Sequence, residues 1–182
     1  MNRLREPMNN CDEELACSGD LEAFTRLVKK HEQSMYRVSR SILTSENECL
    51  DAAQEAIIKA YHSLSTLRDP RFFKSWLMRI LVNECHRLVR KNRKLVLLDE
   101  WHEQASSYRF EENIEVHEAV QLLEEELRLC IVLYYFEDMA IKDISIVLSQ
   151  PEGTIKSRLS RARKKLSAYF TSESTEWRTG HE

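Results

Sequence analysis

Residues Lys142–Leu166 read KDISIVLSQPEGTIKSRLSRARKKL, and this stretch decides the class of fold. A short apolar segment, Lys142–Leu148, is followed by SQPEG and then by a basic amphipathic segment, which is the order of a helix-turn-helix. Pro151 prevents the first helix from continuing, and the small residues beside it permit a tight reversal of the chain. In the second helix the apolar residues recur at steps of three and four, which predicts that they face the core: Ile155, Leu159, Ala162 and Leu166.

The opposite side of this second helix is strongly basic. Residues 154–165 contain six Lys and Arg residues and no Asp or Glu. Such side chains can bridge to guanine edges or to phosphates, and the N-terminus of a helix adds backbone donors for phosphate. Most runs of charge are only a solvated surface, but the turn directly in front of this one favours DNA binding. We expect the DNA-facing side to carry Thr154, Lys156, Ser157, Arg158, Arg161, Lys164 and Lys165.

The composition extends the helical prediction to the rest of the chain. The 182 residues include 3 Gly and 3 Pro, whereas ordinary proteins contain about 12% of the two together. Sheet-rich folds need turn residues at short intervals, and dinucleotide or P-loop folds need glycine where the backbone meets phosphate. The longest apolar run, Cys130–Phe136, is too short to span a bilayer, and the N-terminal residues lack the apolar stretch of a secretory signal. We therefore expect a helical, cytoplasmic protein.

Charge is segregated along the chain, although the net charge is only −3. Residues 71–94 contain eight Lys and Arg against one acid, Glu84, and residues 99–126 contain ten acids against one base, Arg109. Two basic blocks separated by an acidic one are more informative than the total, because a nucleic-acid-binding surface needs only local positive charge. The five cysteines lack Cys-x-x-Cys spacing, so we expect reduced thiols and neither a disulfide framework nor a metal site.

Hydrophobic periodicity divides the chain into two helical parts. The first covers residues 13–94 and the second covers residues 114–170. Residues 95–113 form an acidic linker without a sustained period, and residues 171–182 form a polar tail. The predicted fold is all-α, with two small helical domains of which the second contains the helix-turn-helix.

The helix predicted over Leu50–Leu64 has a mixed solvent face. Its apolar stripe is predicted to consist of Leu50, Ala53, Ile57, Ala60, Tyr61 and Leu64. The side chains left to solvent are Asp51, Gln54, Glu55 and Ile58. A face that combines acids, an amide and an isoleucine could dock another protein, but taken alone it is more often an ordinary amphipathic surface.

A second basic stripe lies within residues 73–94. Its members fall at steps of three or four and so share one helical face: Arg79, Asn83, Arg87, Arg90 and Lys94. Asparagine can read adenine, and Arg and Lys can hold phosphates. Phe72, Phe73 and Trp76 lie at the start of this helix, where an unstacked base would need aromatic surface. The alternative is that Trp76 and one phenylalanine belong to the core.

Three segments together resemble the extracytoplasmic-function (ECF) group of bacterial RNA polymerase sigma factors, within the sigma-70 family. Glu48–Tyr61 (ECLDAAQEAIIKAY) resembles the first-domain signature D-A-E-D-L-V-Q-E-V-F-L-x-A-Y. Phe72–Asn83 (FFKSWLMRILVN) resembles the promoter-reading helix S-F-x-x-W-L-x-R-I-A-x-N. Pro151–Leu166 (PEGTIKSRLSRARKKL) resembles the second-domain ending P-x-G-T-V-K-S-R-L-x-R-A-R-x-x-L, the most specific of the three. One departure is Leu123–Arg128 (LEEELR), where the family has L-P-x-x-x-R, so we expect a helix there to be extended or to start differently.

The resemblance implies two helical domains joined by a flexible acidic linker, with core RNA polymerase and promoter DNA as partners. It assigns docking on the polymerase clamp helices to Asp51, Gln54, Glu55 and Ile58. It assigns the minus-10 element and a flipped base to the Arg68–Lys74 loop together with Arg79, Asn83, Arg87 and Arg90. It assigns the minus-35 element to Thr154, Lys156, Ser157, Arg158 and Arg161. It further implies an anti-sigma factor, often membrane-anchored, and a protein without catalytic residues, metal, cofactor or small-molecule substrate.

Two other classes of protein are alternatives. A helix-turn-helix regulator that binds promoters without recruiting polymerase would explain residues 154–165 but leave the other two motifs as coincidence. A helical metalloenzyme would need ligand pairs such as His31 with Glu32 or Glu84 with His86. Neighbours in sequence point to different helix faces, however, and no H-E-x-x-H spacing occurs. The sigma-factor interpretation accounts for all three motifs.

Overall fold

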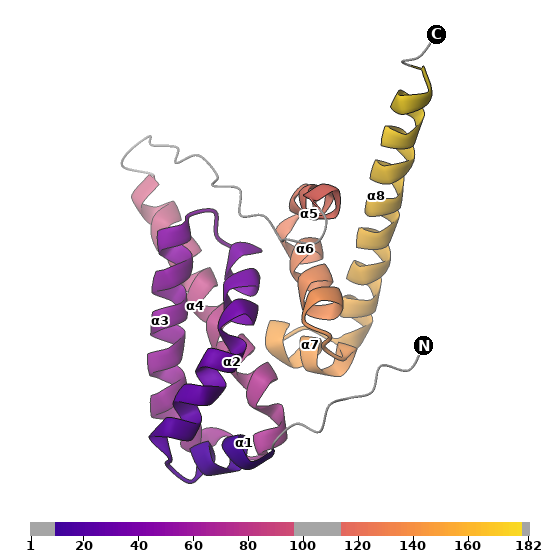
Figure 1. Cartoon of the computed structure of the whole chain (residues 1–182). Coiled ribbons are helices and arrows are strands. Elements are labelled where there is room, and N and C mark those ends of the chain that lie inside the picture. The colour runs from indigo at the N-terminus through magenta and orange to yellow at the C-terminus, as the bar shows by residue number, and fades with distance from the viewer. Residues whose placement is uncertain (1–9, 97–113, 180–182) are drawn as a thin grey trace.

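Every regular element in the described part of the chain is helical (Figure 1). The structure is a computed structural model that describes residues 10–96 and 114–179, and the side chains of residues 12–92 and 115–171. The predicted all-α class is confirmed for these residues. Most of the predicted linker, residues 97–113, lies outside them.

The helices form two groups. The first helical unit comprises α1 (Asn10–Cys17), α2 (Leu21–Arg40), α3 (Glu46–Ser63) and α4 (Phe73–Val96), with short 3-10 turns at Leu64–Thr66 and Pro70–Phe72. The second helical unit comprises α5 (Ile114–Gln121), α6 (Glu125–Ile131), a π-helical turn (Val132–Phe136), α7 (Ile141–Leu148) and α8 (Glu152–Thr179). In Figure 1, α7 lies between the long helices of the first unit and α8, and it packs against both α4 and α8.

Three long helices, α2, α3 and α4, pack against one another and form the core of the first unit. The carboxylate of Asp20 accepts a hydrogen bond from the amide of Ala23 at 2.9 Å, which satisfies a free donor in the first turn of α2. In α4, Leu77 and Leu81 are fully buried. The same helix continues to Val96, so residues 95 and 96 extend it instead of opening the linker.

The buried face of α3 differs from the predicted stripe. Leu50 is 50% exposed and Tyr61 is 46% exposed, and the prediction for these two was wrong. The fully buried face consists of small residues, of which Ala60 alone belongs to the predicted stripe: Cys49, Ala52, Ala56 and Ala60. Both sets follow the helical period, so periodicity cannot separate them. Small side chains on this face let the backbones of neighbouring helices approach closely.

The predicted helix-turn-helix is formed by α7 and α8. Ser149 ends α7 in the left-handed conformation, with φ 52° and ψ 43°. The amide of Gln150 then donates to the carbonyl of Ser145 at 3.0 Å, which closes the end of the helix. Pro151 follows, and α8 begins at Glu152. It continues to Thr179, so residues 171–179, predicted as a polar tail, prolong this helix.

The segment LEEELR does not extend a helix, although it lacks the proline of the family. α5 ends at Gln121 and α6 begins at Glu125, with Glu124 at φ −57° and ψ 145°. Arg128 holds this break, because its Nη1 donates to the carbonyl of Gln121 at 2.8 Å and satisfies the C-terminal end of α5. Its Nε donates to the carbonyl of Ser41 in the first unit at 2.9 Å.

Within residues 10–96 and 114–179, no helix is both long enough and apolar enough to span a bilayer.

Candidate DNA-binding and protein-docking surfaces

The outer face of α4 carries four predicted DNA-contacting residues. Their side chains are all exposed, and their spacing places them along one side of the helix: Arg79, Asn83, Arg87 and Arg90. The face therefore offers three guanidinium groups and one carboxamide to a ligand. This combination suits phosphates and the edge of adenine.

Arg87 does not lie free on this face. Its Nε donates to Glu84 Oε2 at 2.7 Å, and Lys59 Nζ from α3 donates to Glu84 Oε1 at 2.6 Å. Glu84 is 5% exposed. Burial alone would raise the pKa of this carboxyl, but the hydrogen bonds and charges of Lys59 and Arg87 lower the pKa below its ordinary value. Glu84 is thus an ionised link between α3 and the basic face of α4.

The three aromatic residues at the start of α4 have different environments. Phe73 is 1% exposed and Trp76 packs against the core, with their ring centroids 5.9 Å apart. Phe72 is 43% exposed. The core alternative therefore holds for Phe73 and Trp76, and Phe72 is the aromatic ring of this group that an unstacked base could reach.

The first turns of α8 present a polar outer face. Lys156, Ser157 and Arg161 are exposed, and Thr154 is half-buried. The hydroxyl of Ser157 donates to the carbonyl of Thr154 at 2.9 Å. Lys165, further along, forms an ion pair with Glu124.

Arg158 faces its own unit instead of solvent. Its side chain is 13% exposed, and its Nη2 donates to Glu126 Oε2 at 2.6 Å. On a helical wheel of about 100° per residue, Arg158 lies roughly 60° from the centre of the buried stripe formed by Ile155, Leu159 and Ala162. The sequence therefore contained the signal that separates Arg158 from the outer face. The prediction missed it, because it assigned every polar residue outside the apolar stripe to the outer side.

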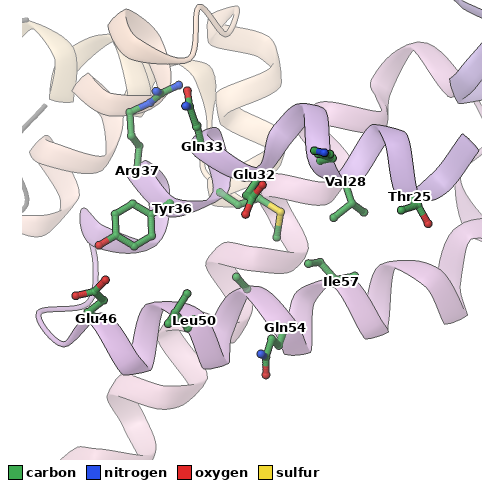
Figure 2. A pocket seen from close by; sticks show the side chains of 13 residues that line it. Thr25, Val28, Glu32, Gln33, Tyr36, Arg37, Glu46, Leu50, Gln54 and Ile57 are labelled. Carbon is green, nitrogen blue, oxygen red and sulfur yellow. The ribbon is translucent and has the colours of Figure 1, made fainter. Parts of the chain in front are cut away.

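The four predicted docking residues of α3 are all exposed: Asp51, Gln54, Glu55 and Ile58. Gln54 also lines a groove of about 910 Å³ between α2 and α3. Figure 2 shows Leu50, Gln54 and Ile57 of α3 on one wall of this groove, opposite Val28 and Tyr36 of α2. The contribution of α2 was missed, because the sequence alone does not show that α2 and α3 leave a hollow between them.

The two units also contact each other through charged groups. Glu137, which follows the π-helical turn, is 3% exposed and pairs with Arg37 of α2 and Lys74 of α4. His86 of α4 contacts Glu125 of α6 at 3.1 Å. These pairs join residues far apart in the sequence, and one apolar core runs through both units.

The cysteines whose side chains are described carry free thiols: Cys17, Cys49, Cys85 and Cys130. Burial raises the pKa of each of these thiols, so they stay protonated near neutral pH and are poor nucleophiles. Among the described side chains, no three His, Cys, Asp or Glu residues are grouped so that they could hold a metal ion.

Comparisons with known proteins match both units. The family model for Sigma-70 region 2 matches residues 27–95, and the model for Sigma-70, region 4 matches residues 113–166. The RNA polymerase sigma factor SigV of Bacillus subtilis is 32% identical over 149 residues, covering 80% of this chain and 90% of that protein. The ECF RNA polymerase sigma factor SigM of Mycobacterium tuberculosis is 30% identical over 152 residues, covering 82% and 78%. The solved sigma factor RpoE of Bartonella quintana, in complex with the anti-sigma factor NepR, shares the fold with a TM-score of 0.73 at 22% identity, covering 83% of this chain and 98% of that one.

Proposed function

The chain belongs to the ECF group of the sigma-70 family. These alternative sigma factors direct RNA polymerase to promoters and catalyse no reaction themselves. On this premise we propose which surfaces of the chain bind polymerase and which bind each promoter element. Residues 13–94 dock on core polymerase and act on the minus-10 element. Residues 114–170 recognise the minus-35 element. Residues 95–113 connect the two parts, so that each can reach its own element and modest affinities add through effective concentration.

Docking on the polymerase clamp helices is assigned to the exposed face of α3, through Asp51, Gln54, Glu55 and Ile58. Protein interfaces combine an apolar centre with a polar rim. Ile58 is 52% exposed and supplies the apolar centre, and the acids and the amide beside it supply the rim. Leu50, also 50% exposed, continues the apolar surface toward the groove that Gln54 lines.

Contact with the minus-10 element is assigned to the basic face of α4 and to the Arg68–Lys74 loop that precedes it. Asn83 is the candidate for reading a base edge, because a carboxamide can pair with adenine in two hydrogen bonds. The guanidinium groups hold phosphates and fix the register: Arg79, Arg87 and Arg90. The exposed ring of Phe72 is the surface on which an unstacked base would lie.

Contact with the minus-35 element is assigned to the start of α8, through Thr154, Lys156, Ser157 and Arg161. The recognition helix of a helix-turn-helix enters the major groove with its N-terminal residues. Arg158 is assigned a different role, because its guanidinium is paired with Glu126. It fixes α8 against α6 and so sets the angle at which the other four side chains meet DNA.

One observation supports this proposal: a single chain exposes a mixed acidic and apolar face on α3 together with two separate basic faces on α4 and α8. A regulator that only binds promoters would need the α8 face alone. The experiment is run-off transcription with bacterial core polymerase, with and without this protein, on genomic fragments from its source. We expect protein-dependent transcripts whose start sites reveal both promoter elements. Salt-sensitive DNA binding without transcripts and without core association would instead identify a plain helix-turn-helix regulator, and the α3 assignment would be withdrawn.

An anti-sigma factor is proposed as the third partner, after core polymerase and promoter DNA. The supporting fact is that the Bartonella quintana structure of the same fold holds such a factor. The cytoplasm is the proposed location, because core polymerase and promoter DNA are found there.

A further inference from the structure

Glu137 reaches across the boundary between the two units. Its Oε1 accepts from Arg37 Nε at 2.8 Å, and its Oε2 lies 3.0 Å from Lys74 Nζ. Lys74 Nζ also donates to the backbone carbonyl of Glu137 at 2.7 Å. The hydroxyl of Ser34, which is 8% exposed, lies beside this carboxylate and contributes to lowering its pKa. One carboxylate of the second unit therefore meets three donors of the first.

The three donors make an anion site that belongs to the first unit. Ser34 and Arg37 come from successive turns of α2, and Lys74 from the first turn of α4. Within the described residues, every ion pair of Arg37 and Lys74 ends on Glu137. The neighbouring ring of His31 adds no charge near neutral pH, because burial and the charge of Lys74 lower its pKa to about 4. Without Glu137, two cations would stand side by side with no counter-ion.

Recognition of a promoter requires the two units to part. Elements named minus-10 and minus-35 lie about 25 base pairs apart, which is roughly 85 Å of B-DNA. In this structure α7 packs against both α4 and α8, so the axes of the two proposed DNA-reading helices are only about 20 Å apart. Because both elements cannot be bound in this arrangement, Glu137 must leave Arg37 and Lys74 when the promoter complex forms.

We propose that Ser34, Arg37 and Lys74 form a phosphate site, which Glu137 fills while the two units are closed and which a backbone phosphate of promoter DNA fills once they separate. The inference rests on the proposed function, since it needs a promoter that both units contact. Phosphate is the favoured ligand because Lys74 ends the loop assigned to the minus-10 element, and because guanidinium, ammonium and hydroxyl donors suit its oxygens. The contact of Glu137 thereby keeps the closed chain from using this part of its DNA surface.

The closed state is tested by small-angle X-ray scattering of the full chain without polymerase. Glu137→Lys places three cations together and should open the units. Separation of two domains of this size should raise the radius of gyration by roughly a quarter. Glu118→Lys is the matched control, with the same charge change at an exposed position on α5, and should leave the radius unchanged. The double variant Glu137→Lys with Lys74→Glu restores an attractive pair and should close the units again.

The phosphate role is tested on preformed holoenzyme by measuring promoter affinity against salt concentration. Lys74→Met keeps the aliphatic stem but removes one phosphate contact, so the slope of log K against log salt should become about one unit shallower. Lys30→Met is the control, because Lys30 pairs with Glu13 instead of Glu137, and it should keep the wild-type slope. The double variant Lys74→Glu with Glu137→Lys should have the radius of gyration of the closed chain. Its affinity for promoter DNA should nevertheless stay low, because a carboxylate replaces the ammonium group that contacts phosphate.

Each measurement has an outcome that overturns the inference. An unchanged radius for Glu137→Lys means that Glu137 does not hold the units together. An unchanged slope for Lys74→Met means that no phosphate enters the site. A loss of core polymerase binding in Lys74→Met, with the slope retained, means that the site takes a carboxylate of the polymerase instead. Failure of the proposed function would show separately, as an absence of transcripts with the wild-type protein.

Discussion

Arg158 offers the sharpest test of how the second unit meets DNA. Its side chain is 13% exposed, and its partner Glu126 is 68% exposed. Truncation in Arg158→Ala removes two buried methylenes, Cγ and Cδ, at about 0.8 kcal/mol each, or roughly 1.6 kcal/mol. The ion pair adds only about 0.5 kcal/mol, because solvent screens the exposed carboxylate. We therefore expect Arg158→Ala to lower the free energy of unfolding by about 2 kcal/mol.

Arg158→Met separates stability from recognition, because it keeps most of the aliphatic stem. We expect it to cost about 0.5 kcal/mol, the value of the lost ion pair, and to leave the preference for the native minus-35 sequence unchanged. Arg161→Met is the matched comparison on the exposed face. It should stay within about 0.5 kcal/mol of wild type in stability and lose about 1–3 kcal/mol of promoter recognition.

Urea unfolding measures the first quantity, and run-off transcription on native and substituted minus-35 promoters measures the second. A double-mutant cycle with Glu126→Gln isolates the ion pair. If folded Arg158→Met loses minus-35 preference as strongly as Arg161→Met, then Arg158 reads DNA after opening its pair with Glu126, and the positioning role assigned to it is wrong.

Three further outcomes are expected. Glu84→Gln should destabilise the protein by only about 1 kcal/mol at pH 7, since its cationic partners Lys59 and Arg87 are nearly half exposed and solvent screens them. Because the folded pKa of Glu84 lies below its ordinary value of 4.5, this difference from wild type should vanish as pH falls through that lowered pKa in urea titrations. Folding lowers the pKa of His31 from 6.5 to about 4. As pH falls, His31 is therefore protonated in the unfolded chain before it is protonated in the folded protein. Wild type should therefore lose about 2 kcal/mol of stability between pH 7 and 5, and His31→Gln should not. Ile58→Glu should weaken core polymerase binding by about 2 kcal/mol in a pull-down titration while leaving thermal unfolding unchanged.

Local chemistry in the sequence was sufficient to predict the helix-turn-helix. Pro151 has no amide hydrogen and cannot continue α7. The apolar residues of α8 recur at steps of three and four, which leaves one possible buried stripe. The break before α6 was harder to predict, because no residue within the break itself causes it. Arg128, a residue of the following helix, satisfies the carbonyl of Gln121, and this contact replaces what a proline would do.

The errors arose where two helical faces were almost equal in their sequence pattern. In α3 the choice lay between Leu50 with Tyr61 and a row of small residues, and only the closeness of α2 and α4 decides it. Contacts between the two units likewise cannot be predicted from the local sequence pattern. Nothing near Glu137 in the sequence identifies Arg37 or Lys74 as partners, because they lie 100 and 63 residues away.

The internal carboxylates explain how a chain with a net charge of −3 can serve as a DNA-binding protein. Cations on or beside the basic surfaces have intramolecular partners: Glu84 pairs with Arg87, Glu124 with Lys165, and Glu137 with Lys74. A phosphate that replaces such a carboxylate gains only the difference between two ion pairs, so each basic surface binds DNA weakly by itself. Weak surfaces on a linked chain bind strongly only when both elements are present at the correct spacing. The pairing of cations with internal acids therefore lowers affinity for random DNA and leaves the choice of site to the promoter and polymerase together.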